Sequence, residues 1–203
     1  MSSTSSRTWA SLWPRLAEEW RRKQLEYSWL RAVMGRHAAF WTVTADALDW
    51  ALEAAGLDDA GLRDRLLALY RELAAYPEVP GVLGVLKERG LAAAILSNGS
   101  PDMLAAAARS AGIGGLLDAV LSVESAGVFK PDARVYALVA ERFGCGRHEV
   151  LFVSANGWDA AGAAAYGFRT VWVNRARLPV DRLPARPHHV VADLNPIPDL
   201  ARS

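Results

Sequence analysis

Ser154, Asn156 and Asp159 lie close together, directly after the apolar run Val150–Val153. An alanine-rich helical pattern follows, so the run is typical of a buried parallel strand whose carboxyl end opens into a turn and a helix. Ligands of open α/β sheets bind outside such strand ends. A hydroxyl, an amide and a carboxylate there are candidates for chemistry on a ligand. The alternative is that Asn156-Gly157 only forms a turn and Asp159 only stabilises the helix dipole.

A second polar strand end is formed by Ser97 and Asn98, after the predicted strand 91–96. Ser100 suits the N-cap of the next helix and Pro101 suits its first turn, so the backbone amides there form an anion site. Ser97 and Asn98 add donors that could hold a carboxylate or a leaving group. The alternative is a helix start without a ligand.

A third candidate is Lys130, which follows the predicted strand 120–123 and directly precedes Pro131. Proline restricts the residue before it to extended geometry, although a single lysine is more often an ordinary surface residue. Right-handed crossovers bring the carboxyl ends of parallel strands to one rim. We therefore expect the three polar strand ends to converge, with one cation and one carboxylate among them.

The elements that precede these strands are helical. One long helix is predicted to end near Gly35, a second to run from an N-cap at Thr44 to Gly56, and a third to cover residues 62–73. An apolar stripe at helical spacing marks the first; it consists of Trp13, Leu16, Trp20, Tyr27, Leu30 and Met34. These patterns predict a polar N-terminal tail over residues 1–12 and a helical cap domain over residues 13–78.

Strands and helices alternate over residues 79–203. Further strands are predicted around residue 151 and at residues 170–173, and an apolar stretch follows at residues 189–192. Such alternation is typical of a parallel, doubly wound sheet. We predict an α/β fold with a Rossmann-like parallel sheet core and a helical-bundle cap.

Composition excludes several classes of protein. The formal net charge is +1, which gives no electrostatic reason to expect nucleic acid or an anionic membrane as a partner. The single cysteine, Cys145, excludes an internal disulfide and a multi-cysteine metal site. No apolar run reaches the roughly 18 residues of a membrane span, and the polar start lacks the apolar region of a signal peptide. We expect a cytoplasmic protein.

Three motifs carry a resemblance to a known family. They are A-I-L-S-N-G-S-P (94–101), F-K-P-D-A-R-V-Y (129–136) and L-F-V-S-A-N-G-W-D-A-A-G (151–162). Together they resemble the last three motifs of the haloacid dehalogenase superfamily, and more narrowly its L-2-haloacid dehalogenase branch. The helical segment 20–31 resembles the cap domain of that branch. Phosphatase relatives usually carry adjacent acidic residues at the last motif to hold Mg²⁺, whereas Ser154 and Asn156 stand in those places here.

The resemblance implies a two-step hydrolysis of an L-2-haloacid. In that family an aspartate attacks the halogen-bearing carbon, displaces halide with inversion and forms an ester, which water hydrolyses to a 2-hydroxy acid. By similarity, Lys130 would keep the nucleophile ionised, and Asp159 would position or deprotonate the water with help from Ser154 and Asn156. The implied partners are the small substrate and water, with no cofactor, metal, nucleic acid or membrane.

The same resemblance implies the substrate-binding residues. Ser97 would bind the substrate carboxylate, while Arg21 and Asn98 would receive the halide. Tyr136 matches a tyrosine near the active site. The apolar pocket would be lined by Leu25, Phe40 and Trp158, although core packing is nearly as good an explanation for Leu25 and Phe40.

One motif of the family is not found in these 203 residues: D-x-Y-G-T-L, which lies on the central first strand and carries the nucleophile. The resemblance therefore implies that this strand and the nucleophile are absent and that the chain as written is inactive. Strands beside an empty central position would be left with unpaired backbone groups, each of which costs about 1–3 kcal/mol when buried.

Three interpretations follow, and they stay open. We favour a start assigned too late, with an in-frame D-x-Y-G-T-L segment upstream of Met1. The second is a non-catalytic, degenerate relative, for which a protein partner or a homodimer is expected. The third is a phosphatase-type hydrolase, which we favour least because that reaction uses the same missing aspartate.

Overall fold

The computed structural model describes residues 9–202. Its first helices are α1 (Trp9–Met34), α2 (Phe40–Ala55), α3 (Ala60–Ala68) and α4 (Val79–Glu88). Then come β1 (Ala94–Ser97), α5 (Pro101–Ser110), β2 (Ala119–Ser122), α6 (Ala133–Phe143), β3 (Leu151–Ser154), α7 (Gly157–Tyr166), β4 (Arg169–Val173), β5 (His189–Val191) and α8 (Ile197–Leu200). This order confirms the predicted α/β class.

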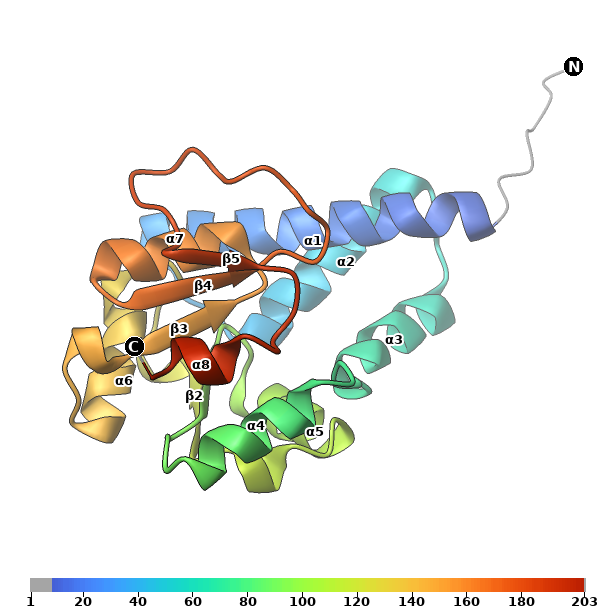
Figure 1. Ribbon diagram of the computed structural model, residues 1–203. Helices are drawn as coiled ribbons and strands as arrows, with labels where there is room; N and C mark the ends of the chain where they lie inside the picture. The colour runs from blue at the N-terminus through green and yellow to red at the C-terminus, as the bar shows by residue number, and fades with distance from the viewer. Residues whose placement is uncertain (1–8, 203) are drawn as a thin grey trace, which may run out of the picture.

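The helical segment packs as an antiparallel pair, α1 against α2, with α3 beside it (Figure 1). Leu16, Trp20 and Leu48 are buried between them. The predicted apolar stripe of α1 is only partly correct, because Leu30 is 49% and Met34 is 70% exposed. Of the predicted tail, residues 1–8 lie outside the described residues, and residues 9–12 belong to α1.

Thr44 does not cap α2, contrary to the sequence prediction. The helix begins four residues earlier, at Phe40, because the Glu124 carboxylate accepts a hydrogen bond from the Phe40 amide at 2.9 Å. Thr44 is fully buried inside the helix, and its hydroxyl donates to the Phe40 carbonyl at 2.8 Å. A cap supplied from 84 residues away in the chain replaces the local cap that the sequence suggested.

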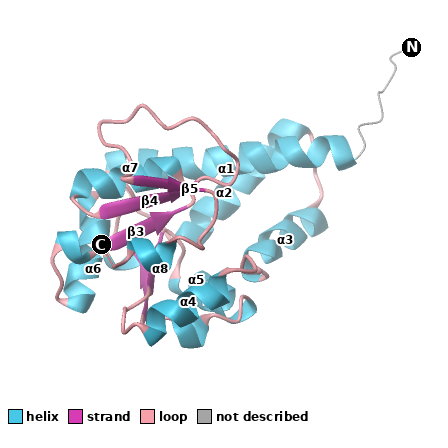
Figure 2. Cartoon of the chain, in the orientation of Figure 1, coloured by secondary structure: helices cyan, strands magenta, loops and turns pink. Residues whose placement is uncertain are grey.

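The parallel strands form two sheets rather than one (Figure 2). The smaller pairs β1 with β2, with Ala94 opposite Ala119. The larger has the order β3-β4-β5, with Leu151 opposite Arg169. Within residues 9–202, therefore, β1 and β3 each have one neighbouring strand, whereas β4 has two.

Candidate active site

Asp159 is the centre of a buried hydrogen-bond cluster. It lies in the first turn of α7 and is 4% exposed. Its Oδ2 atom accepts hydrogen bonds from Lys130 Nζ and from Ser154 Oγ, both at 3.0 Å, while its Oδ1 atom accepts from the Tyr136 hydroxyl at 3.0 Å. These three donors, one of them the Lys130 ammonium, fix the orientation of the carboxylate.

Lys130 connects the ends of the two sheets. It is 5% exposed, and its Nζ atom donates to the Leu96 carbonyl of β1 at 2.8 Å as well as to Asp159. The Asn98 side chain accepts a hydrogen bond from the Lys130 amide at 3.1 Å. Burial lowers the pKa of the Lys130 ammonium, and the Asp159 carboxylate opposes that effect. The ammonium also lies 4.8 Å from the centre of the Phe152 ring.

Tyr136 is fully buried beneath this cluster, on α6. Burial and the adjacent Asp159 carboxylate both raise the pKa of its hydroxyl. The hydroxyl is therefore a neutral hydrogen-bond donor throughout the usual pH range, and it fixes the carboxylate from the side opposite Lys130.

Arg21 brings a second cation to the same strand end, from α1. Its guanidinium donates to Asn156 Oδ1 at 3.2 Å and to Gln24 Oε1 at 2.8 Å. Gln24 is fully buried and donates in turn to Thr44 Oγ1 at 2.8 Å and to the Tyr70 hydroxyl at 3.1 Å. This chain of hydrogen bonds holds the arginine over the ends of the strands.

Sequence reasoning missed Gln24. A signal was available, because Gln24 falls four residues after Trp20 and three before Tyr27, within the apolar stripe of α1. A polar residue at a buried helix position needs hydrogen-bond partners, and here those partners come from α1, α2 and the segment after α3. Phe152 and Glu124 were also missed.

The predicted anion site at the start of α5 differs from expectation in one respect. Ser100 occupies the N-cap position, but its side chain makes no capping hydrogen bond. Ser97 Oγ accepts a hydrogen bond from the Gly99 amide at 3.1 Å, which shapes the turn between β1 and α5. The amides of the first turn of α5 are thus left without a cap from Ser100.

One cavity of about 960 Å³ brings the predicted residues together. Its lining includes ten of the eleven: Arg21, Leu25, Phe40, Ser97, Asn98, Lys130, Ser154, Asn156, Trp158 and Asp159. The eleventh, Tyr136, reaches the site through its hydrogen bond to Asp159.

The apolar part of this wall has a structural role as well. Phe40 is buried in the core with its ring 6.0 Å from that of Phe129, so packing explains part of its position. Trp158 contacts Trp29 of α1 edge to face, at 5.4 Å between ring centres.

Two carboxylates line this cavity among the residues that the structure describes. Asp159 lies at the carboxyl ends of the strands, whereas Glu149 lies two residues before the start of β3 and so at the opposite end. The lining thus offers one carboxylate at the polar end, already engaged by Lys130, Ser154 and Tyr136. Over residues 9–202, no group of three or more His, Cys, Asp or Glu side chains is arranged to hold a metal ion.

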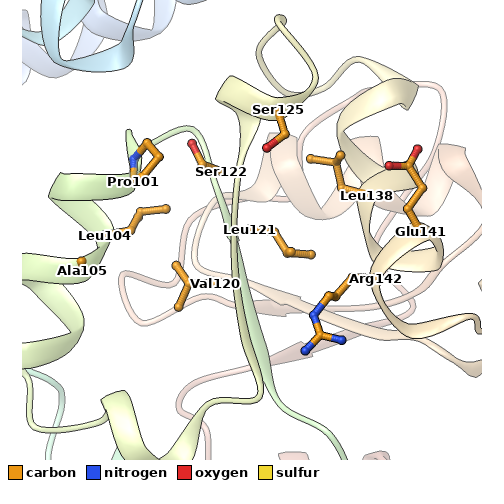
Figure 3. Close-up of a pocket in the computed structure, with 10 residues that line it drawn as sticks. All are labelled: Pro101, Leu104, Ala105, Val120, Leu121, Ser122, Ser125, Leu138, Glu141 and Arg142. Atoms are coloured by element: carbon orange, nitrogen blue, oxygen red, sulfur yellow. The ribbon is translucent and has the colours of Figure 1, made fainter.

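A second cavity, of about 450 Å³, lies beside β2 (Figure 3). Its walls come from α5, β2 and α6, and its charged lining residues are Glu141 and Arg142. None of the predicted site residues lines it. The larger cavity is therefore the candidate active site.

The described helices include none long and apolar enough to cross a membrane.

Comparison with known proteins shows the family of this chain. Residues 4–167 match the family model for haloacid dehalogenase-like hydrolases. The chain is 46% identical over 186 residues to (S)-2-haloacid dehalogenase 1 of Pseudomonas sp. strain CBS-3, covering 91% of this chain and 82% of the relative. It is 43% identical to (S)-2-haloacid dehalogenase 4A of Burkholderia cepacia, with 91% and 80% covered.

A solved structure is similar as well. The L-2-haloacid dehalogenase of Xanthobacter autotrophicus with chloropropionic acid covalently bound superposes with a TM-score of 0.85 at 38% identity, covering 98% of this chain and 89% of that one.

Proposed function

This chain belongs to the (S)-2-haloacid dehalogenases of the haloacid dehalogenase-like hydrolase family, and we propose that its site hydrolyses (S)-2-haloalkanoic acids to 2-hydroxy acids. The observation that carries the proposal is the buried cluster of Lys130 and Asp159 at the polar end of a cavity with apolar walls. A charged pair held by hydrogen bonds beside an apolar pocket suits covalent hydrolysis of a small, partly apolar acid.

The reaction needs two carboxylates with different roles. A carboxylate oxygen attacks C2 of the substrate, the carbon–halogen bond breaks, and halide leaves with the electron pair. Water then attacks the ester carbonyl, which releases the 2-hydroxy acid and restores the carboxylate. Asp159 suits the second step because Ser154 and Tyr136 orient it next to Asn156. Lys130 suits the first step, as a buried cation near an incoming carboxylate.

The remaining polar groups suit the ends of the substrate. Ser97 and the first amides of α5 can bind the substrate carboxylate, because a helix N-terminus favours an anion. Arg21 and Asn98 provide donors for the departing halide at the edge where α1 meets the strand ends. Leu25, Phe40 and Trp158 can contact the alkyl chain.

We propose that this chemistry does not require a metal ion. Asp159 already has a cation, since Lys130 Nζ lies 3.0 Å from its Oδ2 atom, and its neighbours in the strand-end turn are Ser154 and Asn156 rather than acidic residues. A cytoplasmic location and a homodimer remain predictions from the sequence.

We further propose that residues 9–202 supply the water-activating half of the site and that the nucleophile must come from elsewhere. Halide release from (S)-2-chloropropionate tests this. The 203-residue chain is expected to release no halide above background. The same chain with an N-terminal strand ending in Asp is expected to release halide from the S enantiomer, and the matched strand ending in Asn is not.

Each other result contradicts one part of the proposal. Halide release by the 203-residue chain alone would show that a described residue acts as nucleophile. A folded Asp-bearing chain that releases no halide would contradict the dehalogenase activity and would favour a non-catalytic member of the family. Equal rates with the R enantiomer would contradict the assigned substrate stereochemistry.

A further inference from the structure

Arg21 differs from the neighbouring cation of α1 in its partners. Arg22 forms an ion pair with Glu26 at 2.9 Å. Arg21 instead donates to the neutral side-chain amides of Gln24 and Asn156, and it forms no ion pair with another described residue. A guanidinium has more N–H groups than these two contacts use. Arg21 therefore brings both an uncompensated charge and spare donors to the cavity that it lines.

The orientation of the Gln24 amide follows from its neighbours. Because a guanidinium only donates hydrogen bonds, the Gln24 oxygen must face Arg21, which lies 2.8 Å away. The Gln24 nitrogen therefore faces the other way and donates both of its hydrogens, to Thr44 Oγ1 at 2.8 Å and to the Tyr70 hydroxyl at 3.1 Å. Both hydroxyl oxygens are thus acceptors in these bonds, and each must direct its own proton elsewhere.

The two hydroxyl protons are used differently. Thr44 donates its proton to the Phe40 carbonyl at 2.8 Å, inside α2. Among the described residues, no group accepts a hydrogen bond from the Tyr70 hydroxyl, whose one bond is the one it accepts from Gln24. Tyr70 lines the same cavity as Arg21. Its hydroxyl proton is therefore available to a ligand in that cavity.

The Tyr70 ring is held in a fixed position. It lies in the short helix η1 (Leu69–Arg71), and the Trp20 ring packs against it edge to face, at 5.2 Å between ring centres. Burial raises the pKa of the Tyr70 hydroxyl, while the charge of Arg21 and the hydrogen bond from Gln24 oppose that effect. The hydroxyl therefore keeps its proton at neutral pH and acts as a preorganised donor.

We propose that Tyr70 is a halide-binding residue, whose hydroxyl donates to the same halide ion that the Arg21 guanidinium binds. This inference rests on the proposed function, which assigns the departing halide to Arg21. Both donors contact the carboxamide of Gln24, so one rigid, planar group fixes the distance between them. Preorganised donors aimed at a position where negative charge develops stabilise that charge without reorganising.

A halide suits this pair of donors better than the substrate carboxylate does. The carboxylate already has a candidate site at Ser97 and the first amides of α5, at the end of β1. A halide ion is spherical, so it accepts hydrogen bonds from donors in any arrangement. Leu25 and Phe40 add apolar walls to the same cavity, and a hydrogen bond is stronger where the local dielectric is low.

Chloride binding to the 203-residue chain tests the proposal without turnover. Bound chloride broadens the chloride NMR resonance, and added bromide displaces it, which gives the halide affinity. Arg21→Met should remove the excess broadening. Tyr70→Phe should weaken halide affinity about tenfold, because it removes one hydrogen bond to an anion. Tyr27→Phe is the matched control, since Tyr27 does not line the cavity, and it should leave the affinity unchanged.

Thr44→Val separates a direct contact from an effect that acts through Gln24. Like Tyr70→Phe, it leaves one hydrogen of the Gln24 amide without an acceptor, but it removes no free donor from the cavity. We expect its loss of halide affinity to be several-fold smaller than that of Tyr70→Phe.

A bromide-soaked crystal of the unaltered chain provides a second measurement, which does not depend on the folding of a variant. Anomalous diffraction locates the bromide, which should lie within hydrogen-bond distance of both the Arg21 guanidinium and the Tyr70 hydroxyl.

Several results overturn the proposal. An unaltered chain that does not broaden the chloride resonance excludes the halide site. A bromide that contacts Arg21 but not Tyr70, or an unchanged affinity in Tyr70→Phe, excludes the hydroxyl as a ligand. Equal losses in Thr44→Val and Tyr70→Phe would show that the tyrosine acts only through Gln24. Stronger competition from propionate than from bromide would identify a carboxylate as the anion.

Failure of the proposed function gives a different result. If the chain with the Asp-bearing strand releases no halide while chloride binding still depends on Tyr70, only the dehalogenase activity is contradicted. If that chain releases chloride at the same rate with and without Tyr70→Phe, only the role of Tyr70 is contradicted.

Discussion

β4 and β1 are both short, apolar, parallel strands, but they differ in the number of paired edges and in burial. β4 pairs on both edges, and four of its five residues, Thr170 to Val173, are buried. β1 pairs on one edge, and none of its four residues is buried. An apolar sequence is thus not enough to bury a strand. Burial depends on whether neighbouring strands and helices close around it.

The two sheets meet at Lys130, so the largest effect is expected there. Lys130→Met should lower the free energy of unfolding by about 3–5 kcal/mol, because Asp159 would remain buried without its cation. Urea unfolding at pH 7 measures this value. Arg134→Met breaks an exposed ion pair with Asp132 and should cost less than about 1 kcal/mol. Equal losses for both variants would contradict a structural role for the buried pair.

Proline substitutions test the difference between β4 and β1 directly. Val171→Pro removes an amide from the ladder between β4 and β3 and should cost about 3 kcal/mol or more. Ala94→Pro removes an amide on the edge of β1 that has no neighbouring strand within residues 9–202, so it should cost only about 0.5 kcal/mol. Urea unfolding compares them, with Val171→Ala as the control for the lost side chain. A large loss for Ala94→Pro would show that the β1 edge is paired in solution.

Tyr136→Phe tests the β3 side of the cluster. The variant loses a hydrogen bond to a carboxylate, which is worth about 1.5–3 kcal/mol. The effect also depends on pH. Because the pKa of Tyr136 is higher in the folded protein than its ordinary value of 10, its contribution is fully present below pH 10 and is lost as the pH rises further.

The difference in unfolding free energy between wild type and Tyr136→Phe should therefore be constant from pH 7 to 9.5 and shrink above pH 10. Taking the difference removes the contribution of Lys130, whose pKa burial lowers. A difference that does not change up to pH 11 would contradict the raised pKa.

Asn98→Ala tests the β1 side of the cluster and should have a smaller effect than Tyr136→Phe. Its Oδ1 atom accepts one hydrogen bond, from the Lys130 amide, so the loss should be about 1 kcal/mol. Thermal unfolding of the Asn98→Ala and Tyr136→Phe variants, measured in one series, compares the loss of stability on the β1 side of the cluster with that on the β3 side. A larger loss for Asn98→Ala would show that the cluster depends more on β1 than on β3.

Local patterns carried most of the fold prediction. All four predicted strands exist, with boundaries that differ by up to three residues, as for the predicted strand 91–96 and β1 at Ala94–Ser97. The apolar stretch 189–192, which was not predicted to be a strand, contains β5. Apolar runs that end in polar turns determine strands locally, so no tertiary information is needed to find them. The same strand ends located Ser97, Lys130 and Asp159, because chain direction in a parallel sheet fixes the end at which they lie.

Long-range contacts explain the errors. The start of α2 depends on Glu124, and the burial of Gln24 depends on Thr44 and Tyr70. The stripe of α1 did not reveal that Leu30 and Met34 face solvent, since periodicity shows which residues share a face but not what covers that face.

The sequence by itself determined the family, the order of the elements and the polar residues at the strand ends. Tertiary structure alone decided that Lys130 contacts both Leu96 and Asp159 and that two sheets face each other across one cavity. The physical reason is that a strand is encoded by its own residues, whereas a ladder requires a second backbone alongside it. The edges of β1 and β3 have the backbone groups for such a ladder, and the described residues leave them open.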